Sequence, residues 1–182
     1  TICGSKVVDD HGSAEESDLL IACDGKFSAV RSQVFPRMTH ARVLMHRGYT
    51  VFRGHSPPCS ELGNDGFQTW GPGRRFAVVP SPQGHAWFAA VSACLLTGEN
   101  AITADTNLQL LQELFNGWHD PISHLLMTTL GGDEQVLEEE ALASRGVVPN
   151  GLSHVPSNGS LPMAFVGDAS HTLDPILAQG AG

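Results

Sequence analysis

The sequence has few charges, no basic cluster and no long apolar run. Charged residues make up 16% of the 182 residues, against roughly 25% in an average globular domain. The chain has 10 basic and 19 acidic residues and a formal net charge of −9. The acidic balance argues against a nucleic-acid-binding surface. No stretch approaches the length of about 18 apolar residues that a transmembrane helix needs, so no transmembrane helix is predicted.

The four cysteines lack the spacing of a disulfide framework or a zinc site. No two of them are closer than 20 residues, so there is no CxxC pair. The nine histidines include neither an HxxxH nor an HExxH pair. We therefore expect reduced, mostly buried thiols at Cys3, Cys23, Cys59 and Cys94, and no metal site.

The N-terminal part indicates alternating strands and helix. Apolar residues amount to 41% of the chain and occur in blocks, which is typical of a folded protein. Residues 1–8 predict a short strand, residues 9–17 a polar turn, and residues 18–23 (DLLIAC) a strand buried on both faces. Ser28 is placed to cap a short helix from Ala29 to about Phe35, ended by Pro36.

The middle of the chain predicts a mostly antiparallel sheet. β-rich segments, separated by turns that contain glycine and proline, span 43–53, 67–70, 75–79 and 86–92. Residues 54–66 are expected to form a surface loop.

Two helices are predicted after this sheet. Residues 107–118 place Leu108, Leu111, Leu114 and Phe115 on one face, and Asp105 or Thr106 is expected to cap that helix. A shorter helix follows Pro121, with inward positions Ile122, Leu125 and Leu126. The run Glu138–Glu140 is expected to be a solvated face.

The last segment has the pattern of a ligand site. Residues 162–166 (PMAFV) predict a strand that ends in Gly167-Asp168. Open α/β sheets bind ligands at the carboxyl ends of their strands, where a carboxylate can accept hydrogen bonds from ribose hydroxyls. Residues 179–182 (QGAG) predict the start of a helix whose small residues admit an anionic group. A tight strand–loop–helix turn without a ligand would have the same pattern, so both interpretations stay open.

Two motifs in the chain resemble a known family. The segment from Gly167 to His171 (GDASH), with Pro175 and Gln179-Gly180 after it, resembles the GD motif of class A FAD-dependent monooxygenases, the relatives of para-hydroxybenzoate and salicylate hydroxylases. Asp24-Gly25, with Ser28 and Arg31, is similar to the same family's DG motif, DGxxSxxR. The two motifs occur in the family's order, about 140 residues apart.

The resemblance implies a fold and its domains. The fold class is α/β, mixed with α+β: part of an FAD-binding Rossmann-like domain interrupted by an antiparallel-sheet substrate domain. Residues 1–35 and 156–182 would belong to the FAD-binding domain, and residues 36–155 to the substrate-binding domain. The family's GxGxxG motif is missing. We therefore expect an internal fragment that is inactive and binds FAD weakly or not at all when isolated.

The resemblance also implies roles for individual residues. Asp168 would bind the ribose region of FAD, Gly167 would permit its approach, and Pro175 would line the flavin ring. Gln179, Gly180, Ala181 and Gly182 would present backbone to the pyrophosphate and the flavin.

Asp24, Gly25 and Arg31 match a motif that the family links to FAD and NAD(P)H. Structural roles are the alternative: a turn cap for Asp24, an unusual φ for Gly25 and an ion pair for Arg31.

The implied activity is hydroxylation, or epoxidation, of an aromatic or related apolar small molecule. The reductant would be NAD(P)H, and the oxygen would come from O₂ through a flavin hydroperoxide. No catalytic residue is identified. Tyr49, the one tyrosine, and the histidines His46, His55, His85 and His171 are weak candidates.

Two alternatives stay open: a non-catalytic, truncated FAD-fold module, and another flavoprotein such as a reductase or halogenase. The sequence leaves the compartment open, with the cytoplasm favoured, and it leaves the oligomeric state open.

Overall fold

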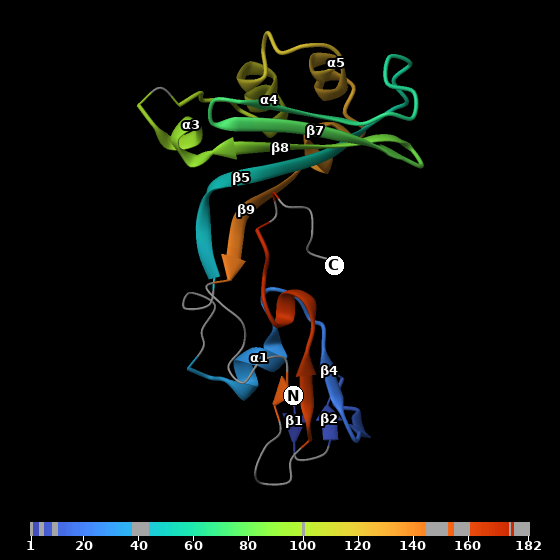
Figure 1. Cartoon of the computed structure of the whole chain (residues 1–182), viewed down its shortest axis with the longest axis vertical. Coiled ribbons are helices and arrows are strands. Elements are labelled where there is room, and N and C mark those ends of the chain that lie inside the picture. Colours follow the sequence, from blue (N-terminus) through green and yellow to red (C-terminus); the bar gives the residue numbers. More distant parts are fainter. Residues whose placement is uncertain are drawn as a thin grey trace. The chain divides into compact units, whose positions relative to one another are not determined.

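The computed structural model describes residues 2–3, 6–8, 11–37, 44–99, 101–144, 153–154, 161–174 and 176. The chain divides into two compact units, which are drawn in Figure 1. Unit 1 comprises residues 1–47 and 142–182, and unit 2 comprises residues 48–141. Two strands, β5 (Leu44–Ser56) and β9 (Leu137–Ser144), pass from one unit to the other. Among the described helices, none is both long and apolar enough to cross a bilayer.

Unit 1 begins with a small antiparallel sheet of β1 (Ile2–Cys3), β2 (Lys6–Val8) and β3 (Ala14–Glu16). The predictions of one strand over residues 1–8 and of a polar turn over residues 9–17 were therefore wrong. All three residues of β3 are exposed, so this strand has no apolar face for a sequence pattern to show. Cross-strand pairing stabilises it instead: Lys6 Nζ lies 3.8 Å from Glu16 Oε1.

A second sheet of unit 1 brings the two ends of the chain together. β11 (Met163–Phe165) pairs in parallel with β4 (Leu20–Ala22) and antiparallel with β10 (Ser153–His154). The strands predicted over residues 18–23 and 162–166 are confirmed. Burial of β4 on both faces was wrong: Ala22 is 2% exposed, but Ile21 is 56% exposed. Successive strand residues point to opposite faces, and the core of unit 1 lies on only one of them.

Helix α1 (Ala29–Val34) covers that face. Its side chains Val30 and Val34 pack against Ala22, Met163 and Phe165. The predicted cap is confirmed, since Ser28 Oγ accepts a hydrogen bond from the Arg31 N–H at 2.9 Å. The helix ends before Phe35-Pro36, as the sequence predicted.

Unit 2 is built on a five-stranded sheet in the order β6-β7-β8-β5-β9. The strands β6 (Phe67–Gly71), β7 (Arg74–Ser81) and β8 (Gly84–Ser92) pair antiparallel, and β8 pairs antiparallel with β5. This confirms the predicted sheet.

β5 continues to Ser56, so the surface loop begins later than residue 54. Gly54 within this strand leaves room for the neighbouring Trp87 ring, since a Cβ at position 54 would lie only 2.4 Å from Cζ2 of Trp87.

The glutamate run 138–140 lies within β9, a strand that the sequence analysis missed. Glutamate has low β propensity, and the run shows no apolar alternation. Its side chains are exposed or half-exposed, as predicted, while the following Ala141 is fully buried. Glu139 pairs with Arg53 of β5 at 2.8 Å.

Helices α4 (Asn107–Leu114) and α5 (Ile122–Met127) cover one face of this sheet (Figure 1). Thr106 caps α4, and its Oγ1 accepts the Gln109 N–H at 3.2 Å. The helix ends at Leu114, earlier than predicted, with Phe115 as its C-cap, and the turn that follows includes Gly117 with φ +77°. A short helix, α3 (Ala93–Thr97), was not predicted.

The predicted inward positions of both helices belong to the buried core of unit 2, except Leu108, which is partly buried and packs against it. The buried residues of this core are Phe52, Cys59, Phe76, Val78, Trp87, Ala89, Val91, Leu111, Leu114, Phe115, Ile122, Leu125, Leu126 and Val136.

The cysteines are less buried than predicted. Cys59 is buried in the core of unit 2, whereas Cys23 and Cys94 are exposed, and all three are free thiols. The Cys3 side chain lies outside the described residues.

Candidate functional site

The DG segment turns the chain from β4 into α1. Gly25 has φ +80°, a left-handed conformation that favours glycine. Asp24 Oδ2 accepts the Val30 N–H at 3.1 Å, so this carboxylate caps the start of the helix. Partial burial alone would raise the pKa of Asp24, but hydrogen bonds from the Ser28 hydroxyl and the Val30 backbone outweigh it and lower the pKa.

Arg31 joins the two motifs. Its side chain is 1% exposed, and its Nη1 donates to the carbonyl oxygens of Asp168 at 3.3 Å and Ala169 at 2.8 Å. Its Nη2 donates to the carbonyl of Lys26. Burial lowers the pKa of Arg31, while attraction to Asp24 raises it. One guanidinium thus fixes the backbone of the GD turn, 137 residues further along the chain.

The GD turn is a short 3₁₀ segment, η2 (Gly167–Ala169), which Val166 connects to the end of β11. Gly167 has φ +54°, and its carbonyl accepts the N–H groups of Ser170 and His171, both at 3.0 Å. Thr172 Oγ1 donates to the Asp168 carbonyl at 3.4 Å. The backbone of Asp168 is therefore fixed on both sides. Its half-buried side chain accepts no hydrogen bond from any residue that the structure describes.

Three buried polar atoms surround this turn without a hydrogen-bond partner among the described residues: Arg31 Nε, Ser170 Oγ and His171 Nδ1. A Cβ placed on Gly167 or Gly25 would meet no atom within 4 Å, so the backbone borders open space at both glycines. Buried polar atoms normally have partners. The side-chain groups at this turn, a carboxylate, a hydroxyl and an imidazole, are of the kinds that bond a ligand rich in hydroxyl groups, such as the ribose part of a dinucleotide.

The rest of the predicted cofactor segment lies mostly outside the described residues. Pro175, Gln179, Gly180, Ala181 and Gly182 belong to this undescribed part.

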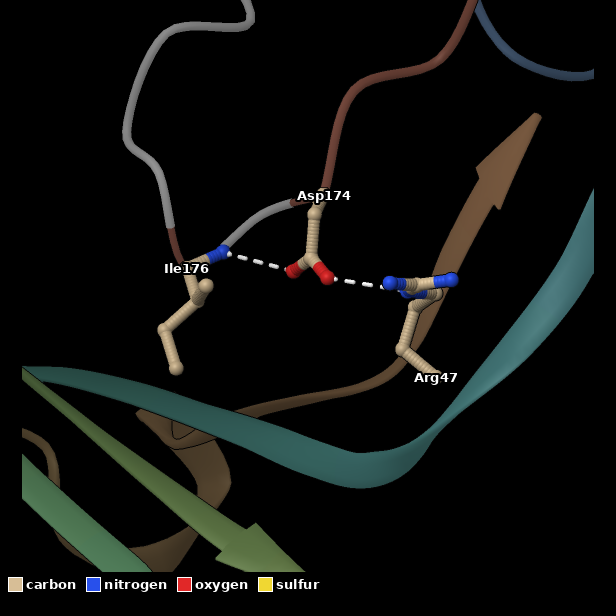
Figure 2. Close-up of polar contacts among 3 residues, drawn as sticks. All are labelled: Arg47, Asp174 and Ile176. Atoms are coloured by element: carbon tan, nitrogen blue, oxygen red, sulfur yellow. Dashed lines mark hydrogen bonds and ion pairs between the residues drawn. The ribbon is translucent and has the colours of Figure 1, made fainter. Parts of the chain in front are cut away.

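The residues on either side of Pro175 are described, and Figure 2 shows their contacts. Asp174 Oδ1 accepts the Ile176 N–H at 3.1 Å, and Asp174 Oδ2 accepts from Arg47 Nε at 2.9 Å.

A second candidate site lies on the sheet of unit 2, on the face opposite its helices. Phe76 and Val78 of β7 point into the core under α4 and α5. Arg75 directly precedes Phe76 on this strand, so its side chain points to the other face of the sheet. The Arg75 guanidinium lies 4.5 Å from the ring centre of Trp70 and 4.9 Å from that of Phe88.

Polar groups complete this Arg75 cluster. Arg75 Nη2 donates to Gln68 Oε1 at 2.6 Å. Burial lowers the pKa of Arg75, and the nearby Tyr49 phenol raises it. Trp70 remains 65% exposed and Arg75 only 5%. Tyr49 was predicted as a candidate pocket residue from the sequence. Arg75 and Trp70 were not predicted, because their pairing depends on the register of β6 and β7.

The histidines have structural contacts. His85 is 1% exposed; its Nδ1 accepts the Cys59 N–H at 3.4 Å, and its Nε2 lies 3.2 Å from the Gly63 carbonyl. These hydrogen bonds connect the loop that follows β5 to His85 of β8. His46 and His55 are exposed on β5. His171 is part of the GD turn described above.

No family model matches the chain, but individual proteins do. Aurachin C monooxygenase/isomerase of Stigmatella aurantiaca is 30% identical over 93% of this chain and 40% of that protein. Zeaxanthin epoxidase of Arabidopsis thaliana is 27% identical over 96% of this chain and 24% of that protein.

A solved structure of Klebsiella pneumoniae HpxO, complexed with FAD and uric acid, matches with a TM-score of 0.73. It is 26% identical and covers 97% of this chain and 42% of that chain. This chain spans between a quarter and about two fifths of these proteins' lengths. The resemblance drawn from the DG and GD motifs is confirmed: the chain is a relative of the class A FAD-dependent monooxygenases.

Proposed function

We propose that this chain is part of an FAD- and NAD(P)H-dependent monooxygenase that hydroxylates or epoxidises an aromatic or related apolar small molecule. The observation that supports this most is the pair of hydrogen bonds from Arg31 to the carbonyls of Asp168 and Ala169, which fix the backbone of the GD turn. The Asp168 carboxylate itself has no protein partner among the described residues. Bound FAD would supply the redox chemistry, with NAD(P)H as reductant and O₂ as oxidant.

Residues of unit 1 are proposed to hold the cofactor through side-chain and backbone contacts. Asp168 would accept hydrogen bonds from ribose hydroxyls, and Gly167 would let the ribose approach the backbone. Pro175 would line the flavin ring, and residues 179–182 would offer backbone N–H groups to the pyrophosphate and the flavin.

Asp24, Gly25 and Arg31 would act indirectly. Asp24 is engaged with the helix start, and the two Arg31 Nη atoms are engaged with backbone carbonyls. We therefore assign both side chains to positioning the turn that bears Asp168. Gly25 supplies the positive φ that the DG turn needs.

The Arg75 cluster is proposed to contact the substrate. An exposed indole beside a buried guanidinium provides a flat apolar surface and a positive charge for a planar molecule with an oxygen acceptor. The Tyr49 phenol beside Arg75 adds a hydrogen-bonding group.

The test is NAD(P)H oxidation by the complete protein that contains this chain, with FAD, O₂ and a panel of aromatic substrates. We expect one substrate class to stimulate oxidation and Trp70→Ala to raise its KM. Met127→Ala is the matched control, because Met127 is 67% exposed on α5, away from this face.

Equal KM values in the two variants would refute the proposal that the Arg75 cluster contacts the substrate. FAD binding without NAD(P)H oxidation would favour another flavoprotein activity, and absence of FAD binding would favour a non-catalytic module.

A further inference from the structure

The loop between α4 and α5, residues 115–121, contacts the edge strand β6 from the helix side of the unit 2 sheet. β6 pairs with β7 and stands at one end of the described strand order of this sheet. Phe67 packs against the core that the helices cover. Thr69 and Gly71, two and four residues further along β6, therefore face the same side.

His119 of this loop bridges to Thr69. Its Nε2 lies 2.6 Å from Thr69 Oγ1, and its Nδ1 lies 2.7 Å from the Asp120 carbonyl oxygen. Because a carbonyl can only accept, Nδ1 donates, whereas the Thr69 hydroxyl can donate to Nε2 or accept from it. The imidazole also lies 5.1 Å from the Phe67 ring, centre to centre. One side chain thus contacts two residues on this face of β6.

Trp118 contacts the end of the same strand. A Cβ at Gly71 would lie 2.7 Å from Trp118 Cζ2, so the indole lies directly against the glycine. The loop therefore contacts β6 at three successive positions of one face, which are 67, 69 and 71.

The other face of β6 bears two residues of the Arg75 cluster. Gln68 Oε1 accepts from Arg75 Nη2 at 2.6 Å, and the ring centre of Trp70 lies 4.5 Å from the Arg75 guanidinium. Thr69 stands between Gln68 and Trp70 in the strand and points to the opposite side. A shift of β6 would therefore move both side chains relative to Arg75, which belongs to β7.

We propose that His119 is a positioning residue for the Arg75 cluster. Through Thr69 it fixes β6, and β6 in turn fixes Gln68 and Trp70 against Arg75. For the substrate, this inference rests on the proposed function, which makes Trp70 part of the substrate surface. The fixing of β6 by His119 stands on the contacts alone.

The first test is amide hydrogen exchange of the β6 backbone in the complete protein. Thr69→Val removes the hydroxyl but keeps a β-branched side chain that favours strands. We expect it to speed exchange by about two- to tenfold, the factor that one net hydrogen bond represents. Thr69→Ser keeps the hydroxyl and should restore the wild-type rate. His119→Leu should also speed exchange, and combining it with Thr69→Val should add less than its separate effect, because the two residues interact.

Thr128→Val is the matched control. The Thr128 hydroxyl donates to the His124 carbonyl at 2.8 Å, at the end of α5. Equal β6 exchange in Thr69→Val and Thr128→Val would overturn the proposal. Fully additive effects of Thr69→Val and His119→Leu would overturn it as well.

The second test is steady-state NAD(P)H oxidation with the substrate that stimulates it. We expect His119→Leu to raise the KM by about two- to tenfold, the range of one aromatic contact, with kcat unchanged, since only binding is weakened. Faster β6 exchange with an unchanged KM would overturn the link to the substrate. If no substrate stimulates oxidation by the unmodified protein, the proposed function fails, and the exchange result alone still decides whether His119 fixes β6.

Discussion

Replacing Arg31 by methionine should release the turn that bears Asp168. The guanidinium donates to three backbone carbonyls, those of Lys26, Asp168 and Ala169, and it is 1% exposed. Hydrogen bonds to charged groups contribute about 1.5–3 kcal/mol each, partly offset by the cost of burying the charge. We therefore expect a net loss of about 3 kcal/mol, in the range seen when a buried charged network is broken.

Amide exchange of the GD turn, together with chemical denaturation of the complete protein, measures this effect. The N–H groups of Ser170 and His171, which bond to the Gly167 carbonyl, should exchange faster in Arg31→Met. Arg31→Lys should recover little, since one ammonium cannot replace the planar fork. The control Arg53→Met removes an exposed pair and should cost less than about 1 kcal/mol.

Two results would refute this reasoning. One is a cost for Arg31→Met no larger than that of the control. The other is unchanged exchange at Ser170 and His171, which would mean that the turn keeps its shape without the guanidinium.

Three further predictions concern the local structure. The pKa of Asp24 is lowered in the folded chain, so the ionised carboxylate stabilises the fold at pH values above the ordinary aspartate pKa of about 3.9. This contribution is lost as the pH falls through the lowered pKa. Asp24→Asn should therefore flatten the acid limb of a stability–pH curve, and an unchanged acid limb would contradict the pKa shift. Gly54→Ala should destabilise unit 2 by about 1–3 kcal/mol, because its Cβ would lie 2.4 Å from Trp87; a melting temperature equal to wild type would argue against this packing. Ser28→Ala should cost about 1 kcal/mol in urea unfolding through loss of the α1 cap, and a neutral effect would show that Asp24 caps the helix alone.

Features that depend on local pattern were predictable from the sequence. The β4 and β11 strands, the Ser28 cap and the inward leucines of α4 and α5 follow from apolar spacing and capping preferences. The DG and GD motifs likewise pointed to the correct family. Each of these signals lies within about a dozen consecutive residues.

Features that depend on tertiary contact were not predictable. The charged strands β3 and β9 have no apolar alternation, and cross-strand partners stabilise them. The exposure of Ile21 depends on which face of β4 the core covers. Arg31 was predicted to lie next to a carboxylate or a cofactor. Its bonds to carbonyl groups 137 and 138 positions away depend on the fold.

FAD titration of the complete protein tests the central claim most directly. We expect saturable binding of one FAD per chain, weakened about tenfold or more by Asp168→Ala, because hydrogen bonds to a charged group contribute about 1.5–3 kcal/mol. Asp65→Ala, an exposed aspartate of unit 2, should bind FAD like the wild type. Absence of FAD binding, or equal affinity in the two variants, would contradict the assignment of the GD turn as a cofactor site.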